Sequence, residues 1–240
     1  MPEKREPPTS PAGMNKGLKS SVLDVGARFV QDASPLKGFD AYVVGLHCAK
    51  EDPSMQMEAH HYCKRANEDL LQCAIFDGNT REANLIGIEY IISEGLFESL
   101  PEDEKPYWHP HNFEVLSGQL VAPDLPDVVE KRLMEQLINS YGKTWHTWHT
   151  GTHLGGPGDP LPYGDAHLMW SFNRDGEADE RLLQDRNRTM KIDTEKKRRD
   201  RQSLVERAHP QRGVNTLKDA FPEAASTPPG VRDAAEEGRG

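Results

Sequence analysis

The runs Met57-Glu-Ala-His-His-Tyr-Cys-Lys64 and Leu70-Leu-Gln-Cys-Ala-Ile-Phe76, separated by a short polar connection, decide the fold class of this chain. Both runs lack the periodicity of an amphipathic helix, so each is expected to be a strand. Residues 39–48 before them have the same character, as do residues 85–92 after the turn signals at 77–79. The four runs predict an antiparallel meander.

The remaining elements extend this sheet and add a few helices. Residues 113–121 alternate and are expected to be a strand, and residues 143–149 and 167–172 are the last strand candidates. A short helix is expected near residues 20–31, and one or two helical turns within residues 97–108. The clearest helix is 127–141, with Asp127 as its cap and Gly142 as its stop. The sequence therefore predicts an α+β fold, a mostly antiparallel sheet with a few flanking helices.

The composition divides the chain into three parts. Residues 1–19 are rich in proline and small residues and are expected to form a disordered leader. Residues 20–173 are expected to form the α+β domain. In residues 174–240 the hydrophobic residues thin out, which predicts a charged tail, partly helical or disordered, rather than an arm that binds nucleic acid.

Charge and cysteine content exclude several classes of function. Residues 39–173 hold 8 basic and 21 acidic residues, a net charge of −13, whose field would repel a nucleic acid. The longest apolar stretches are far shorter than the ~20 residues of a transmembrane helix. Cys48, Cys63 and Cys73 form neither a CxxC pair nor a disulfide-rich pattern, and no signal peptide is evident. These features predict a cytoplasmic protein without transmembrane segments, in which Cys48 and Cys73 are small core residues.

Clustered histidines are the strongest candidates for a functional site. Nine of the ten lie between residues 47 and 167, and imidazole is the commonest metal ligand. His109 and His111 would project to one face of an extended segment, whereas His60 and His61 on a strand point to opposite faces, so at most one of these two should join the site. The candidate ligands of zinc, iron, manganese or copper are His60, His61, His109, His111, His146, Glu89 and Glu114. The candidate residues of an adjoining ligand-binding wall are His47, Tyr62, Trp108 and Trp148.

Other interpretations of these histidines stay open. Three ligands with an open position could activate water or bind a carbonyl or dioxygen ligand, but buried histidines can equally be satisfied by backbone carbonyls. His149 and His153, in a Gly-rich loop, are expected at the surface. Residues 109–114 are similar to the first cupin motif, although Glu114 falls too close and the glycine spacing differs, so a cupin is a minor alternative.

An ordered succession of motifs resembles the oil body-associated protein family. The resemblance runs from about residue 22 to residue 172, and its recurring polar positions fall on His47, Glu58, His60, His61, Glu89, His109, His111, Glu114 and His146. The motifs that carry it include Val22-Leu-Asp-Val-Gly-Ala27, Met57-Glu-Ala-His-His-Tyr-Cys63, Leu85-Ile-Gly-Ile-Glu-Tyr-Ile-Ile-Ser93, Trp108-His-Pro-His111 and Tyr141-Gly-Lys-Thr144. The chain departs from the family at Asn112, where Glu is usual, in the longer loop at 148–164, and in the extension after Asn173.

The resemblance implies a protein found with seed lipid droplets and without an established catalytic activity. We therefore expect a cytoplasmic protein that is peripheral on lipid droplets, with the droplet surface or a droplet protein as partner, and with a histidine-rich metal site. Residues 20–31 and 127–141 are the candidate amphipathic helices for such contact, although both are expected to pack on the sheet. The alternatives are a metal-dependent enzyme acting on a small or lipid-derived substrate, and a pocket that binds a polar ligand.

Overall fold

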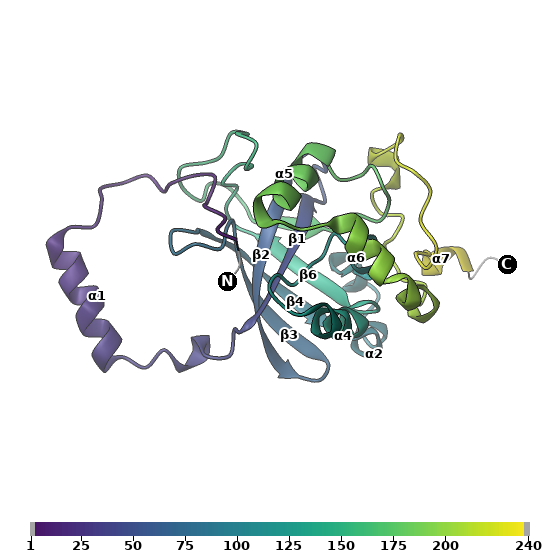
Figure 1. Cartoon of the computed structure of the whole chain (residues 1–240), viewed down its shortest axis with the longest axis horizontal. Coiled ribbons are helices and arrows are strands. Elements are labelled where there is room, and N and C mark those ends of the chain that lie inside the picture. The colour runs from purple at the N-terminus through teal and green to yellow at the C-terminus, as the bar shows by residue number, and fades with distance from the viewer. Residues whose placement is uncertain (1–2, 238–240) are drawn as a thin grey trace.

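The computed structural model describes residues 3–237 of the chain, and its centre is a closed antiparallel barrel (Figure 1). The predicted meander is confirmed, because its four strands pair in sequence order. β6 pairs with β4 on one side and with β7 on the other, and β7 pairs back to β1. These pairings close the sheet, which the sequence did not predict. The barrel strands are β1 (Ala41–Ala49), β2 (Gln56–Asn67), β3 (Leu70–Phe76), β4 (Leu85–Ile92), β6 (Tyr141–His146) and β7 (His167–Trp170).

Strand alternation in β2 separates an inner from an outer set of side chains. Ala59 and Met57 contribute to a buried cluster that also holds Ile75 of β3 and Met169 of β7. His61 shares their side of the strand and faces the interior. The intervening residues, Glu58 and His60, face outward and are covered by other segments of the chain. The register of this strand therefore decides which of its polar residues can meet in the barrel.

A short strand and a helix fill part of the wall between β6 and β1. β5 (His109–Pro110) pairs with Gly142 and Tyr141 of β6, and α3 (Asn112–Ser117) follows it directly. The predicted strand at residues 113–121 is therefore wrong. All six residues of α3 are buried, so the helix has no polar face from which a helical period could be read. Gly118, with φ 80°, ends it in the left-handed conformation.

The helix predicted at residues 127–141 is shorter than expected. α4 (Asp127–Leu137) starts after Pro126 instead of being capped by Asp127 and ends four residues before Tyr141, where β6 begins. Tyr141 falls at helical spacing by coincidence, and Gly142 lies in the strand instead of stopping the helix. The strand predicted at 143–149 accordingly begins and ends earlier, as β6. The short turns expected within 97–108 are present as η2 (Lys105–Tyr107), preceded by α2 (Glu94–Glu98).

The C-terminal segment packs against the barrel. Leu182, Leu204, Val214 and Val231 belong to the same buried cluster as Phe113 and Trp170. The boundary predicted at residue 173 therefore does not separate this core from a tail. Buried arginines explain why a charge-rich sequence can pack here, because their guanidinium groups donate to buried backbone carbonyls. The elements of this segment are α5 (Glu180–Met190), α6 (Thr194–Asp200), η3 (Gln202–Arg207), η4 (Lys218–Ala220) and α7 (Ala234–Glu237).

The N-terminal residues also differ from the predicted disordered leader, of which residues 1–2 lie outside the described residues. The side chain of Arg5 is buried and pairs with Glu58 of β2 at 2.7 Å and with Asp185 of α5 at 2.6 Å. Its backbone exchanges two hydrogen bonds with Asn79 in the β3–β4 turn. Residues near the N-terminus are thus fastened to the barrel wall.

The helix that follows stands away from the barrel. α1 (Leu18–Val30) and the short η1 (Ser34–Leu36) lie on an arm that leaves the body of the molecule and returns to β1 (Figure 1). Leu18 and Val30 are more than 80% exposed, so the expectation that this helix packs on the sheet is wrong. Each helix within residues 3–237 is too short or too polar to cross a bilayer.

Two of the cysteines form a disulfide that the sequence analysis did not anticipate. Cys63 of β2 lies directly opposite Cys73 of β3, and their sulfur atoms are bonded. Spacing along the chain could not reveal this pair, because it depends on the register of the β2–β3 hairpin. Cys48 is a buried thiol, as expected.

Replacing Arg201 by Met tests whether the C-terminal segment stabilises the barrel. The guanidinium group donates to the carbonyls of Val115 and Leu120 at 2.8 Å each and pairs with Glu130. Removing it takes a buried donor from the Leu120 carbonyl and a cation from the buried carboxylate of Glu130, so we expect the free energy of unfolding to fall by about 3 kcal/mol or more. Urea denaturation measures this loss. The exposed Arg199→Met, two residues earlier in α6, is the control, and an equal effect of both variants would contradict the prediction.

Candidate metal centre

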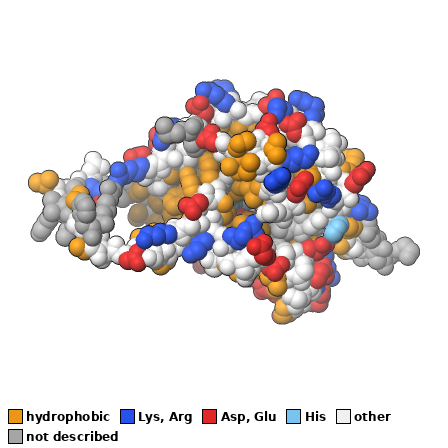
Figure 2. Space-filling model, turned by 60° about the horizontal axis from the view of Figure 1, so that its bottom comes forward, with side chains coloured by type: hydrophobic (Ala, Val, Ile, Leu, Met, Phe, Trp, Pro, Cys, Tyr) orange, Lys and Arg blue, Asp and Glu red, His pale blue; other side chains and the backbone are white. Residues whose placement is uncertain are grey.

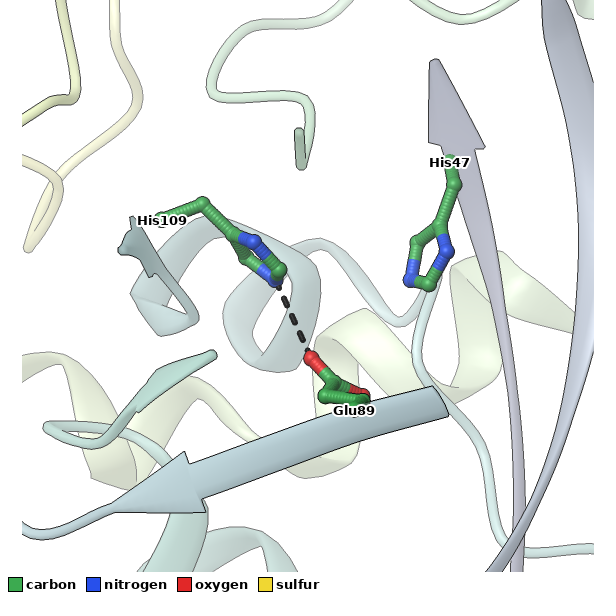
Figure 3. A group of neighbouring side chains, drawn as sticks. All are labelled: His47, Glu89 and His109. Atoms are coloured by element: carbon green, nitrogen blue, oxygen red, sulfur yellow. Dashed lines mark ion pairs between the residues drawn. The ribbon is translucent and has the colours of Figure 1, made fainter. Parts of the chain in front are cut away.

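Polar side chains from five segments converge inside the barrel. The strands β1, β2, β4 and β6 contribute one imidazole or carboxylate each, and β5 with the start of α3 contributes the rest. Figure 3 shows the rings of His47 and His109 approaching the carboxylate of Glu89 from different sides. All of these side chains are almost completely buried. The set consists of His47, His61, Glu89, His109, His111, Glu114 and His146.

The carboxylate of Glu89 is the middle of this set. Its Oε1 lies 3.3 Å from Nε2 of His109 and 3.6 Å from Nε2 of His111, and these two nitrogens are 3.2 Å apart. Ligands at 2.0–2.1 Å from a tetrahedral ion are separated from each other by ~3.3 Å. Glu89 Oε1 makes no hydrogen bond within the described residues in spite of these short contacts. The three atoms are therefore arranged as ligands of one ion would be.

Ser140 fixes the orientation of His111. Its hydroxyl donates to the carbonyl of Leu137 at 2.7 Å, so its oxygen accepts from Nδ1–H of His111 at 2.8 Å. This bond leaves the lone pair of His111 on Nε2, the atom that faces Glu89 and His109. Such a partner behind a ligand is the usual means by which proteins set the tautomer of a metal-binding histidine.

Gly142 keeps space open between the three ligand atoms. A Cβ at this position would lie 2.2 Å from Glu89 Oε1 and 2.7 Å from Nε2 of both His109 and His111. No carbon atom can occupy that point beside these atoms, and a carbon there would also be too close to a metal ion bound to all three. The glycine in β6 is therefore a requirement of the site.

The electrostatics favour the neutral form of His109 and His146 and the ionised form of Glu89. Burial lowers the pKa of His109, and burial followed by the neighbouring His61 lowers the pKa of His146 to about 3. Burial alone would raise the pKa of Glu89, but His61, His109 and His111 hold it well below its usual value. Burial, and then the charge of Glu89, raise the pKa of Glu114 well above its usual value. Neutral imidazole and carboxylate are the protonation states that bind metals.

A second group of imidazoles adjoins Glu89. The second carboxylate oxygen of Glu89, Oε2, is 3.1 Å from Nε2 of His61. Nδ1 of His47 lies 3.3 Å from Nε2 of His146, whose Nδ1 faces the sulfur of Met57 at 3.0 Å. Burial, followed by His61 and His146, lowers the pKa of His47 well below its usual value.

His60 lies outside the centre, although it was a candidate ligand. On the outer face of β2, its Nε2 is 2.9 Å from Glu58 and its Nδ1 is 2.7 Å from the hydroxyl of Tyr42. Of the 60–61 pair, of which at most one was expected in the site, the structure brings His61 and not His60 to the other candidate ligands. His153, expected at the surface, packs 3.7 Å from the same Glu58.

The aromatic candidates of a ligand-binding wall are dispersed. Tyr62 stacks on Tyr42 on the outer face of β2. Trp108 donates to Glu104, and Trp148 donates to the carbonyl of Asp159. Of the four residues predicted for this wall, only His47 lies in the centre.

Sequence reasoning missed the residues that support the ligands. Ser140 and Gly142 lie where the helix was expected to end, so neither was considered for the site. Met57 and Thr144 are further buried neighbours from β2 and β6. The signal that could have found Gly142 is its position within the family motif Tyr141-Gly-Lys-Thr144, once that motif is placed on a strand.

Comparisons with known proteins agree with the resemblance seen in the sequence. The family model described as "Protein of unknown function (DUF1264)" matches residues 33–205. "Oil body-associated protein 2A" of Arabidopsis thaliana is 42% identical over 161 residues, 67% of this chain and 63% of that protein, so the match spans less than two thirds of that relative. "Oil body-associated protein 1A" of Zea mays is 36% identical over 201 residues, 84% of this chain and 81% of that protein. No solved structure matches the chain. The chain therefore belongs to the DUF1264 family, together with the oil body-associated proteins.

Proposed function

We propose that the protein binds a divalent transition metal in its barrel, with Glu89, His109 and His111 as ligands. The observation that carries this proposal is the convergence of Glu89 Oε1 and the two Nε2 atoms on the space that Gly142 leaves open. Two further features support it. The orientation of His111 by Ser140 leaves its Nε2 available, and burial keeps the imidazole of His109 neutral.

The donor set suits the metals expected from the sequence. Two imidazoles and one carboxylate are the ligands of many zinc enzymes and of non-haem iron enzymes, and manganese or copper can also use them. Such an ion would supply Lewis-acid or redox chemistry at positions that the protein leaves open. A metal-dependent enzyme acting on a small or lipid-derived substrate is thus the alternative function. A surface cavity of about 420 Å³ supports it, because Trp170 lines the cavity and its ring lies 5.9 Å from that of His109.

Gly142→Ala tests the metal site directly. The new methyl group would occupy the space between the three ligand atoms, so we expect the purified or reloaded protein to lose its bound metal. Inductively coupled plasma mass spectrometry measures the metal content, and circular dichroism checks the fold. Gly95→Ala in α2, where the nearest atom is 3.9 Å from the added Cβ, is the control.

A milder variant covers the case in which Gly142→Ala fails to fold. Ser140→Ala removes the hydrogen bond that orients His111, and we expect a 10–100-fold loss of metal affinity. Stoichiometric metal with unchanged affinity in both variants would refute the proposed site.

Acidification tests the buried neutral imidazoles in the metal-free protein. His47 and His146 have lowered pKa values when folded, so below about pH 6.5 the unfolded chain binds more protons than the folded one. Stability should therefore fall as the pH drops from about 6.5 toward 3, by up to about 1.4 kcal/mol per pH unit for each histidine. Glu114 has the opposite effect on stability. Above about pH 4.5 the folded state keeps the proton of Glu114 and the unfolded state loses it, so this contribution to the free energy of unfolding falls as the pH rises.

The histidine contribution can be isolated by chemical denaturation at several pH values. His146→Leu should reduce the slope of unfolding free energy against pH, whereas His209→Leu, at an exposed position, should leave it unchanged. An identical slope in His146→Leu and in the wild type would contradict the prediction.

We also propose that the protein associates peripherally with lipid droplets through the α1 arm. The names of the relatives support this role, and so does the exposure of Leu18, Val25 and Val30 on α1. Figure 2 shows hydrophobic side chains gathered on the body of the molecule beside the arm. An apolar hollow of about 330 Å³ is lined in part by Leu36, Phe39, Tyr62 and Phe76.

The double substitution Val25→Glu and Val30→Glu tests this association. Burying a valine side chain in lipid contributes roughly 1.5 kcal/mol, so flotation with phosphatidylcholine-coated triacylglycerol droplets should fall at least about tenfold. Val128→Glu is the matched control, since it replaces an exposed valine on α4. Wild-type protein that remains entirely in the aqueous fraction would rule out direct association.

A further inference from the structure

The second oxygen of Glu89 faces a different set of side chains from the first. Oε1 approaches His109 and His111, whereas Oε2 lies 3.1 Å from Nε2 of His61. A carboxylate whose two oxygens face separate groups of imidazoles has the arrangement of a bridging ligand. The proposed ion at Oε1 leaves the contacts at Oε2 unexplained.

His61 has no hydrogen bond to account for its burial. It is 2% exposed, and neither of its ring nitrogens makes a hydrogen bond within the described residues. Its Nε2 approaches Glu89 Oε2 without the geometry of a hydrogen bond. Buried polar atoms almost always have a partner, so each exception in a folded protein requires an explanation. A metal ion between this nitrogen and Oε2 of Glu89 would give the nitrogen a partner.

Two further imidazoles lie beside His61. The ring of His47 is 4.9 Å from that of His61, centre to centre, and its Nδ1 is 3.3 Å from Nε2 of His146. That nitrogen of His146 carries a lone pair if Nδ1–H is directed at Met57, whose sulfur is 3.0 Å away. The separation of 3.3 Å is again the ~3.3 Å expected between two ligands of one tetrahedral ion.

We propose that the barrel holds a second divalent metal ion, bound by Glu89 Oε2, His61, His47 and His146. This inference rests on the proposed site at Glu89 Oε1, with which it shares the carboxylate as a bridge. Two ions bridged in this way lie about 3.5–4 Å apart, the spacing of two-metal centres that bind an oxygen ligand between them. The ligands come from β1, β2, β4 and β6, so only the closed barrel assembles this position.

Metal stoichiometry in the full chain distinguishes the two proposals. Protein stripped of metal and reloaded with Mn²⁺ or Zn²⁺ should contain two ions per chain by mass spectrometry. His146→Ala should retain one ion, and His111→Ala should lose the ion at Oε1 first. His153→Ala is the control, because this histidine packs outside the barrel, and it should retain two ions.

A spectroscopic measurement covers variants that fold poorly. Wild-type protein with two Mn²⁺ ions should give an exchange-coupled electron paramagnetic resonance spectrum, and one Mn²⁺ ion a six-line spectrum. One ion per chain, unaffected by His146→Ala, would overturn the second position and leave the proposed function intact. The absence of any bound metal would overturn both.

Discussion

The pairing of β4 with β6 is the constraint on which the rest of the structure depends. It joins Gly87 to His146 at one end and Ile92 to Tyr141 at the other, and it converts an open meander into a barrel. The same register sets Glu89 opposite Thr144, two residues from Gly142. A shift of β6 by one residue against β4 would turn His146 and Thr144 outward while Glu89 still faced the interior. The same strand pairing therefore closes the sheet and brings the polar side chains of the centre together.

A barrel with ionisable groups in its interior must satisfy them there. The imidazoles gathered around Glu89 offset the cost of burying its charge, whereas burial, followed by the charge of Glu89, raises the pKa of Glu114. Outside the barrel wall, buried polar groups are satisfied by arginines. Arg5, Arg186 and Arg201 pair with carboxylates or donate to backbone carbonyls. The inner groups lack such permanent cations, which is why their arrangement suits metal binding.

The sequence reveals the local parts of this fold better than the long-range ones. The meander was predictable because each strand pairs with its neighbour in the chain, whereas the β4–β6 pairing joins segments about fifty residues apart. Alternation predicted that at most one residue of the pair at 60–61 could lie with the other candidate ligands, but only the barrel decides that it is His61. His109 and His111 were placed together by their spacing. Gly142 was assigned to a helix end, because its role depends on side chains from other strands.

The buried pairs of Arg5 have a consequence for the α1 arm. They fasten the chain on one side of the arm, and β1 fastens it on the other, so α1 lies within a loop closed at both ends. Such a loop explores far fewer positions than a free tail of the same length. In the proposed contact of this helix with a lipid surface, the barrel would be limited in how far it could turn beneath it. The molecule would then sit in a restricted orientation, with the same side of the barrel directed toward the lipid in every copy.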